Sequence, residues 1–278
     1  MLKTLGAQIK EFKKDSFLTP VFMILEVLME TIIPLMMASI IDNGVEAGDI
    51  HHIYVMGGCM VIVACISLFA GTMGGKYGAR ASAGFARNLR KAMYENIQTF
   101  SFSNIDKFST AGLVTRLTTD VTNLQNAYQM LLRMCVRAPI SLICAMIMAF
   151  FINAKLASVY LAAVIVLGVI LAIITVRAHH YFMEVFPKYD DLNASVQENV
   201  SAIRVVKAYV REDHEKKKFT QASKNIYNMF VKAEGVLAFN SPVMQIAVYS
   251  CIIALSWLGA KMIVAGSLTT GELMSLLT

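Results

Sequence analysis

Five long apolar stretches constrain the fold of this 278-residue chain more than any other feature. They run approximately over Phe17–Ile41, Ile53–Gly75, Met130–Ile152, Leu156–Val176 and Val236–Ala260. A helix rises about 1.5 Å per residue, so each stretch is long enough to cross the roughly 30 Å apolar core of a bilayer. A sixth stretch begins at about Thr270, and the residues to Thr278 do not complete it. We therefore predict an all-α membrane protein with five spans and the start of a sixth.

The composition excludes an ordinary soluble domain. Hydrophobic residues make up 56% of the chain and charged residues 16%. Soluble domains have about 45–50% and about 25%, respectively. A core alone does not explain the surplus of apolar residues, because a globule of this size needs more polar surface than the chain carries.

The lysine and arginine residues predict the orientation in the membrane. Most of the 25 lie before the first stretch or in the connections 76–129 and 177–235. The connection after the first stretch carries Asp42, Glu46 and Asp49 instead. The positive-inside rule therefore predicts a multi-pass protein of the cell membrane with a cytoplasmic N-terminus. It also explains the net charge of +6, so we expect the lipid bilayer, and no nucleic acid, as a partner.

The two long connections are predicted to be helical hairpins. In the first, helical spacing relates five apolar residues on the outward arm: Phe85, Leu89, Met93, Ile97 and Phe100. On the returning arm, steps of three and four relate Val114, Leu117, Val121, Leu124, Tyr128 and Leu131. Such seams are typical of helices packed side by side. Each membrane helix should thus continue into the cytoplasm, with turns near Asn104–Gly112 and Ser201–Tyr209. The simplest role of such arms is a stabilising bundle, but tips held far from the bilayer also suit docking.

Four motifs stand out along the chain: Ile40–Gly44, Phe108–Val121, the run Gln197–Tyr209 with the following Glu212, Glu215 and Lys218-Phe219, and Gly266–Leu273. Together they resemble landmarks of one family, the transmembrane domains of ABC exporters of the bacterial multidrug and lipid half-transporter kind. The motifs occur in the expected order over nearly the whole chain. Ala202 departs from the pattern, since the family often has glycine there.

The resemblance implies that residues 1–278 form an ABC transporter transmembrane domain with long helices that extend into the cytoplasm. It also implies pairing with a second transmembrane subunit, as a homo- or heterodimer, and coupling helices that dock onto an ABC nucleotide-binding domain. The implied coupling positions are Phe108, Ser109, Thr110, Gly112 and Leu113 at the first tip, and Ala202, Ile203, Arg204, Val205, Val206, Lys207 and Tyr209 at the second.

A nucleotide-binding domain is not evident in the sequence. A phosphate-binding loop needs a glycine-rich turn and a lysine followed by serine or threonine. Gly75-Lys76 is the one Gly-Lys pair, and Tyr77 follows it. We expect no enzymatic activity and no catalytic, cofactor or metal residues in this chain, with ATP and Mg²⁺ bound by a domain outside it. The unfinished sixth stretch favours a fragment of a longer half-transporter over a subunit with a separate ATPase.

Charged residues inside the spans are candidates for the substrate pathway, because a charge in lipid is costly. Glu26 and Glu30 lie one turn apart in the first span, and Arg133 and Arg137 do the same in the third. The depths suit a Glu26–Arg137 ion pair, whose simplest role is structural, whereas Glu30 lies deeper without an evident partner. A Glu30 that faces a cavity would favour cationic amphipathic substrates.

The leading functional hypothesis is the transmembrane subunit, or a fragment, of an ATP-driven ABC exporter. An alternative is a truncated membrane interaction protein that binds an ATPase without transporting. A secondary transporter is disfavoured, because inverted repeats and interrupted spans, its usual features, are not evident.

Overall fold

A computed structural model of the chain describes residues 2–101 and 109–278. All regular structure in these residues is helical, and five helices are long and apolar enough to cross a membrane. The predicted all-α fold with five spans is therefore confirmed. The chain forms two compact units, unit 1 (Met1–Ala157 and Leu258–Thr278) and unit 2 (Ser158–Trp257).

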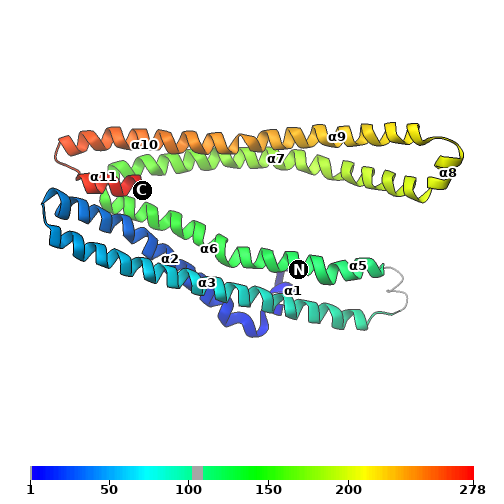
Figure 1. Cartoon of the computed structure of the whole chain (residues 1–278), viewed down its shortest axis with the longest axis horizontal. Coiled ribbons are helices and arrows are strands. Elements are labelled where there is room, and N and C mark those ends of the chain that lie inside the picture. Colours follow the sequence, from blue (N-terminus) through cyan, green and yellow to red (C-terminus); the bar gives the residue numbers. More distant parts are fainter. Residues whose placement is uncertain (1, 102–108) are drawn as a thin grey trace. The chain divides into compact units, whose positions relative to one another are not determined.

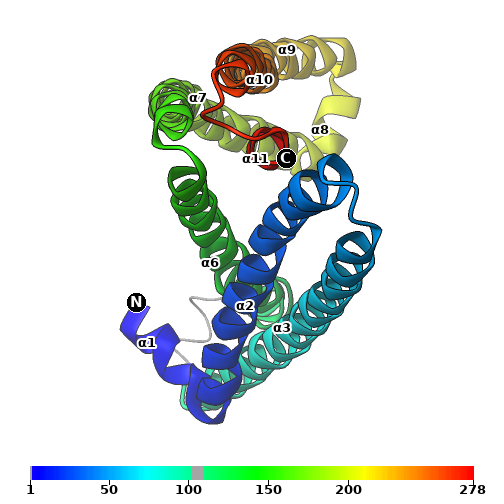
Figure 2. The ribbon, with the colours of Figure 1, turned by 90° about the vertical axis from the view of Figure 1, so that its left-hand side faces the viewer.

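Unit 1 is built around α2, which packs against α3 and α6, while α3 also packs against α6 (Figures 1 and 2). Its elements are α1 (Leu2–Gly6), η1 (Ala7–Phe12), α2 (Lys13–Ser39), η2 (Ile40–Glu46), α3 (Ile50–Gln98), α5 (Thr110–Thr115), η3 (Arg116–Asp120), α6 (Val121–Ile152) and α11 (Thr270–Leu277). The element η1 is a 3-10 helix, and η2 and η3 are π-helices. The predicted helix start near Thr270 is confirmed by α11, which a Thr269–Glu272 capping box begins.

Glycines allow α2 and α3 to approach closely. Gly71, Gly74 and Gly78 recur at steps of three and four, so they share one face of α3. A Cβ atom at Gly71 would lie 2.9 Å from Oε1 of Glu26, and one at Gly78 would lie 3.3 Å from Cγ2 of Thr19. The missing side chains on α3 thus leave the space that side chains of α2 occupy, with Met23 lying over Gly74.

A small apolar core holds the end of unit 1 that is remote from the η2–α3 loop. Phe85, Ala86 and Leu89 of α3 are buried together with Val121 of α6, and Met93 packs against them. The predicted helical face of α3 is thereby confirmed at Phe85, Leu89 and Met93.

The predicted seam on the returning arm holds only in part. Val121 is buried, but Val114, Leu124 and Leu131 are exposed. The π-helix η3 precedes α6, and its wider turn shifts the register that steps of three and four assume. Val114, which precedes η3, therefore does not share a face with Val121. Leu124 and Leu131 follow η3 as Val121 does, so the register shift does not account for their exposure.

Unit 2 is a long helical hairpin extended by α10. It contains most of α7 (Ala154–Ser201), then α8 (Ile203–Ala208) and α9 (Glu212–Ala238), and most of α10 (Asn240–Val264). The helices α7 and α9 run side by side with α8 at their end (Figure 1), and the rings of Phe182 and Phe230 meet edge to face at 6.2 Å. The continuous α7 confirms that a membrane helix extends well beyond its apolar stretch.

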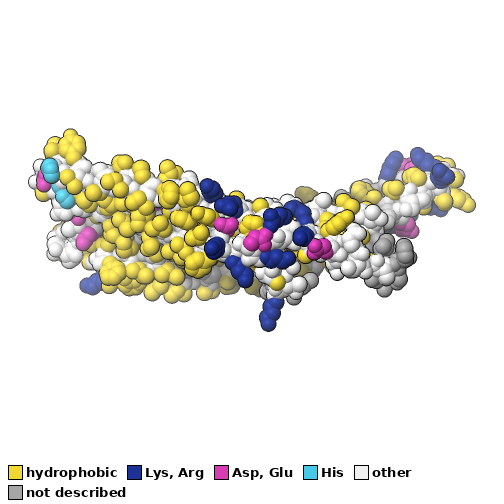
Figure 3. Space-filling model, turned by 90° about the horizontal axis from the view of Figure 1, so that it is seen from below, with side chains coloured by type: hydrophobic (Ala, Val, Ile, Leu, Met, Phe, Trp, Pro, Cys, Tyr) yellow, Lys and Arg dark blue, Asp and Glu magenta, His cyan; other side chains and the backbone are white. Residues whose placement is uncertain are grey.

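The surface of the chain changes character along the helices. On the face shown in Figure 3, hydrophobic side chains cover the left-hand part, and lysine and arginine side chains gather where this coverage ends. Such a boundary is typical of helices that leave the apolar core of a bilayer.

Candidate functional site

The second hairpin tip is a short helix that exposes apolar side chains. The predicted positions from Ala202 to Tyr209 coincide with α8 and its two flanking residues. Ile203 and Val205 are exposed, and Tyr209 is 75% exposed. An exposed cluster of this kind on a turn between two long helices is a candidate protein-binding surface.

Val210, which follows the predicted positions, has a strained backbone. Its φ of 51° lies in the left-handed region, which a β-branched residue rarely adopts. The N–H of Val210 donates to the carbonyl of Lys207 at 3.2 Å, and the N–H of Arg211 donates to that of Val206 at 3.0 Å. These two bonds form a Schellman motif, in which glycine is the usual left-handed residue. The sequence offers no signal for this turn, because valine is not a turn residue.

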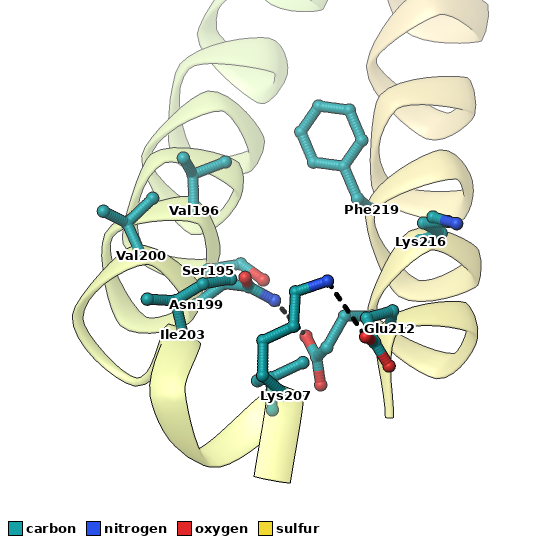
Figure 4. Close-up of a pocket in the computed structure, with 11 residues that line it drawn as sticks. Ser195, Val196, Asn199, Val200, Ile203, Lys207, Glu212, Lys216 and Phe219 are labelled. Carbon is teal, nitrogen blue, oxygen red and sulfur yellow. Dashed lines mark hydrogen bonds and ion pairs between the residues drawn. The ribbon is translucent and has the colours of Figure 1, made fainter. Parts of the chain in front are cut away.

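Polar contacts join the two arms at this tip (Figure 4). Nδ2 of Asn199 donates to Oε2 of Glu215 at 2.9 Å, and Nζ of Lys207 donates to Oε1 of Glu212 at 3.0 Å. Glu212 lies at the polar end of α9, outside the apolar stretch. Its pKa is lowered because its carboxylate accepts a backbone hydrogen bond at the helix start and a hydrogen bond from Lys207.

A pocket of about 370 Å³ lies between α7, α8 and α9 at the same tip. Val196 and Val200 of α7 and Phe219 of α9 give it apolar walls (Figure 4). Its charged lining is mixed, with Lys207 and Lys216 beside Glu212 and Glu215. The tip therefore combines exposed apolar groups with paired charges of both signs.

The first hairpin tip is described from Ser109 onward, and Phe108 lies outside the described residues. Oγ of Ser109 accepts a hydrogen bond from the N–H of Gly112 at 3.0 Å and so caps α5. Thr110 and Leu113, the other predicted contacts here, lie in the same short helix. The local sequence thus forms a capped helical turn at this tip as well.

A branched ion pair joins α2 and α6 within the apolar part of unit 1. Nη1 of Arg137 donates to Oε1 of Glu26 at 2.8 Å, as the sequence predicted. Nη2 of Arg137 lies 2.8 and 2.9 Å from the two carboxylate oxygens of Glu30. The expectation that Glu30 has no partner is therefore wrong. The two glutamates share one helix face, and the forked guanidinium reaches both.

This triad, Glu26, Glu30 and Arg137, has a sheltered and an accessible side. The side chain of Glu26 is 14% exposed, whereas those of Glu30 and Arg137 are 44% and 43% exposed. Two carboxylates face one guanidinium, so the triad carries an excess negative charge when all three groups are ionised. Arg133 forms no ion pair with any residue that the structure describes, and its Cδ packs over Gly78.

The remaining charges do not suggest a metal site. Within residues 2–101 and 109–278, no group of three or more His, Cys, Asp or Glu side chains could hold a metal ion.

Comparison with known proteins places these features in a family. Residues 16–278 match the family model of the ABC transporter transmembrane region. The chain is 32% identical over 257 residues to the uncharacterized ABC transporter ATP-binding protein YfiB of Bacillus subtilis, covering 92% of this chain and 45% of that protein. It is 30% identical over 278 residues to the uncharacterized ABC transporter ATP-binding protein Rv1273c of Mycobacterium tuberculosis, covering 100% and 48%.

A more distant relative is the ATP-dependent lipid A-core flippase of Syntrophus aciditrophicus, which is 25% identical over 224 residues, covering 81% of this chain and 35% of that protein. The chain spans less than half the length of each of these relatives. The family model alone covers nearly the whole chain, and the helical architecture agrees with it. The chain therefore belongs to the ABC transporter transmembrane region family.

Proposed function

We propose that this chain forms half of the translocation pathway of an ATP-driven exporter and receives the driving movement through its two hairpin tips. The observation that carries the proposal is the second tip, a short helix with exposed apolar side chains at the end of two long helices. In a member of this family, such a surface fits a groove on a nucleotide-binding domain. That domain would bind ATP and Mg²⁺, and a second transmembrane subunit, identical or different, would complete the pathway.

The long helices suit the transmission of movement. The 48 residues of α7 form one helix from the apolar part to the tip. A rigid element of this kind converts a displacement at its tip into a rotation of its membrane part. We place the tips and the N-terminus in the cytoplasm. The reason is that the lysine and arginine residues concentrate in the N-terminal segment and in the two hairpins, and such residues favour the cytoplasmic side.

The proposed substrate is an amphipathic lipid or a related apolar molecule. The flippase relative is named for lipid A-core, and it is 25% identical to this chain over 224 residues. We propose that Glu26, Glu30, Arg133 and Arg137 line the pathway. Glu30 and Arg137 are the accessible members of the triad and would contact a polar headgroup, while Glu26 holds Arg137 in place.

A chimera tests this proposal. The chain would replace the matched half of YfiB, so that the rest of that protein supplies the ATP-binding part. Purified chimera in liposomes should move a fluorescent phospholipid between leaflets when ATP is added. The control is the same chimera with the catalytic glutamate of its ATP-binding part changed to glutamine, which should bind ATP without transport.

Two results would count against the proposal. ATP hydrolysis that depends on the chain, with no movement of phospholipid, cationic dye or peptide, would favour the alternative of an interaction protein. ATP hydrolysis by the chimera that stays unchanged when the tips are altered would remove the coupling role of the tips.

A further inference from the structure

Asp42 joins two segments of unit 1 that are far apart in the sequence. One carboxylate oxygen, Oδ2, accepts a hydrogen bond from the hydroxyl of Thr269 at 2.7 Å. The other, Oδ1, accepts one from the N–H of Gly271 at 2.8 Å. Both donors lie at the first turn of α11, whereas Asp42 lies in η2 at the end of α2. A single side chain thus ties the end of the first span to the start of α11.

The contact is close because residue 271 is glycine. A Cβ atom there would collide with the carbonyl oxygen of Ala38 and would lie 2.7 Å from both carboxylate oxygens of Asp42. Leu273 and Leu276 of α11 are buried, and Leu273 lies against Gly259 of α10. The helix α11 also packs against α2, so the polar bonds lie at the edge of this packing.

Three features suit this contact to opening and closing. The Thr269–Asp42 bond is exposed to solvent, so water can replace it at small cost. Asp42 belongs to a π-helix, a structure that often marks functional sites and allows a change of register. Gly48 and Gly266, which have positive φ values, lie in the loops beside η2 and α11 and provide places to bend.

We propose that Asp42 is a releasable latch that holds the ends of α2 and α11 together at the η2–α3 loop end of unit 1. The Lys and Arg distribution places this end outside the cell, where an exporter must open to release its substrate. The latch closes that end, and its release lets α11 separate from α2. This role goes beyond the proposed coupling through the tips and is testable without them.

Distance measurements on the full chain in lipid nanodiscs test the latch. The five native cysteines would be replaced, and spin labels attached at Met37 on α2 and Met274 on α11, which are both about half exposed. Pulsed electron paramagnetic resonance should show one short distance in the parent protein. In Asp42→Asn, which loses the charge of the acceptor, the ratio of long to short distances should rise about tenfold.

Two further variants sharpen the result. Gly271→Ala leaves every charge in place but forces α11 away from Ala38, so it should also lengthen the distance. Asp49→Asn is the matched control, because Asp49 lies in the adjoining η2–α3 loop and its carboxylate accepts from the N–H groups of His51 and His52 at the start of α3. It should leave the distance unchanged.

The outcomes separate a latch from a fixed joint. A latch predicts a longer distance in Asp42→Asn at an unchanged melting temperature by circular dichroism. Gly271→Ala should lengthen the distance and also lower the melting temperature, because the added Cβ meets the backbone oxygen of Ala38. A lower melting temperature with an unchanged distance in folded Asp42→Asn would show that Asp42 only stabilises the fold, and would overturn the proposal. If Asp42→Asn does not fold, Thr269→Val, which removes the exposed bond to Asp42, decides between these outcomes in the same way.

Discussion

The two units use the same amphipathic helices in different ways. In unit 1, glycines, a branched ion pair and the Phe85 core bring three helices into close contact. In the hairpin of unit 2, the buried residues of α7 and α9 are few, and the tip depends on exposed polar bonds. Helical periodicity alone therefore does not say whether an apolar face is used within the chain. Unit 1 buries part of its apolar faces between its own helices, whereas unit 2 presents several apolar side chains at its tip.

The largest effect is expected in the triad of unit 1. Arg137→Gln leaves Glu26 and Glu30 close together in apolar surroundings without a counter-charge, and should cost about 3–5 kcal/mol of unfolding free energy. Arg133→Gln is the control, because Arg133 takes no part in the triad, and it should change stability by less than about 1 kcal/mol. Chemical denaturation in detergent micelles measures both. Equal losses would mean that the pairing geometry of Arg137 contributes nothing.

A pair of glycines tests the difference in packing between the units. A Cβ at Gly84 in unit 1 would enter the ring of Phe12, so Gly84→Ala should destabilise by about 1–3 kcal/mol. Gly235 in α9 of unit 2 has open space, so Gly235→Ala should stabilise by about 0.5–1 kcal/mol through helix propensity. The same denaturation experiment should show a lower unfolding free energy for Gly84→Ala and a higher one for Gly235→Ala. Two losses of similar size would contradict the contrast.

The strained backbone of Val210 at the second tip predicts a smaller change, which is a gain in stability when the strain is relieved. Val210→Gly relieves the left-handed backbone and should stabilise the turn after α8 by about 1 kcal/mol. Val205→Gly, inside α8, should instead destabilise it by about 1 kcal/mol. Hydrogen exchange of the amides of Val210 and Arg211 reports on both. Faster exchange in Val210→Gly would show that the valine side chain itself holds the turn.

The smallest effect concerns pH at the same tip. The pKa of Glu212 is lowered in the fold, so its contribution to stability is present above its ordinary value of 4.5 and is lost as the pH falls through the folded pKa. Paramagnetic labels on the two arms should therefore show a broader range of distances between the arms in acid. Glu212→Gln should remove this pH dependence, and a dependence that persists would assign it to another group.

The sequence was a good guide to features that repeat or that follow from charge. Apolar length predicted the spans, the apolar stretch that begins near Thr270 predicted α11, and matched depth predicted the Glu26–Arg137 pair. The register change at η3 was missed, because a π-helix has no clear local sequence pattern. The second bond of Arg137 depends on side-chain reach, which spacing along one helix does not give.

The contacts of Asp42 and the turn at Val210 could not be predicted for a related reason. Asp42 meets Gly271 only after the whole of unit 1 has folded, and nothing near either residue signals the pairing. At Val210 the tertiary hairpin imposes a conformation that the local residue disfavours. Predictions from sequence thus fail where distant contacts decide the conformation.

The central claim is that the second tip couples ATP hydrolysis to transport, and the number of lipids moved per ATP hydrolysed tests it most directly. In the YfiB chimera, Tyr209→Ala at the tip should lower this ratio at least about tenfold, as expected for an exposed aromatic anchor at an interface. Tyr227→Ala, which removes a similarly exposed tyrosine from α9 away from the tip, should leave it unchanged. Equal ratios in the two variants and the parent chimera would contradict the claim.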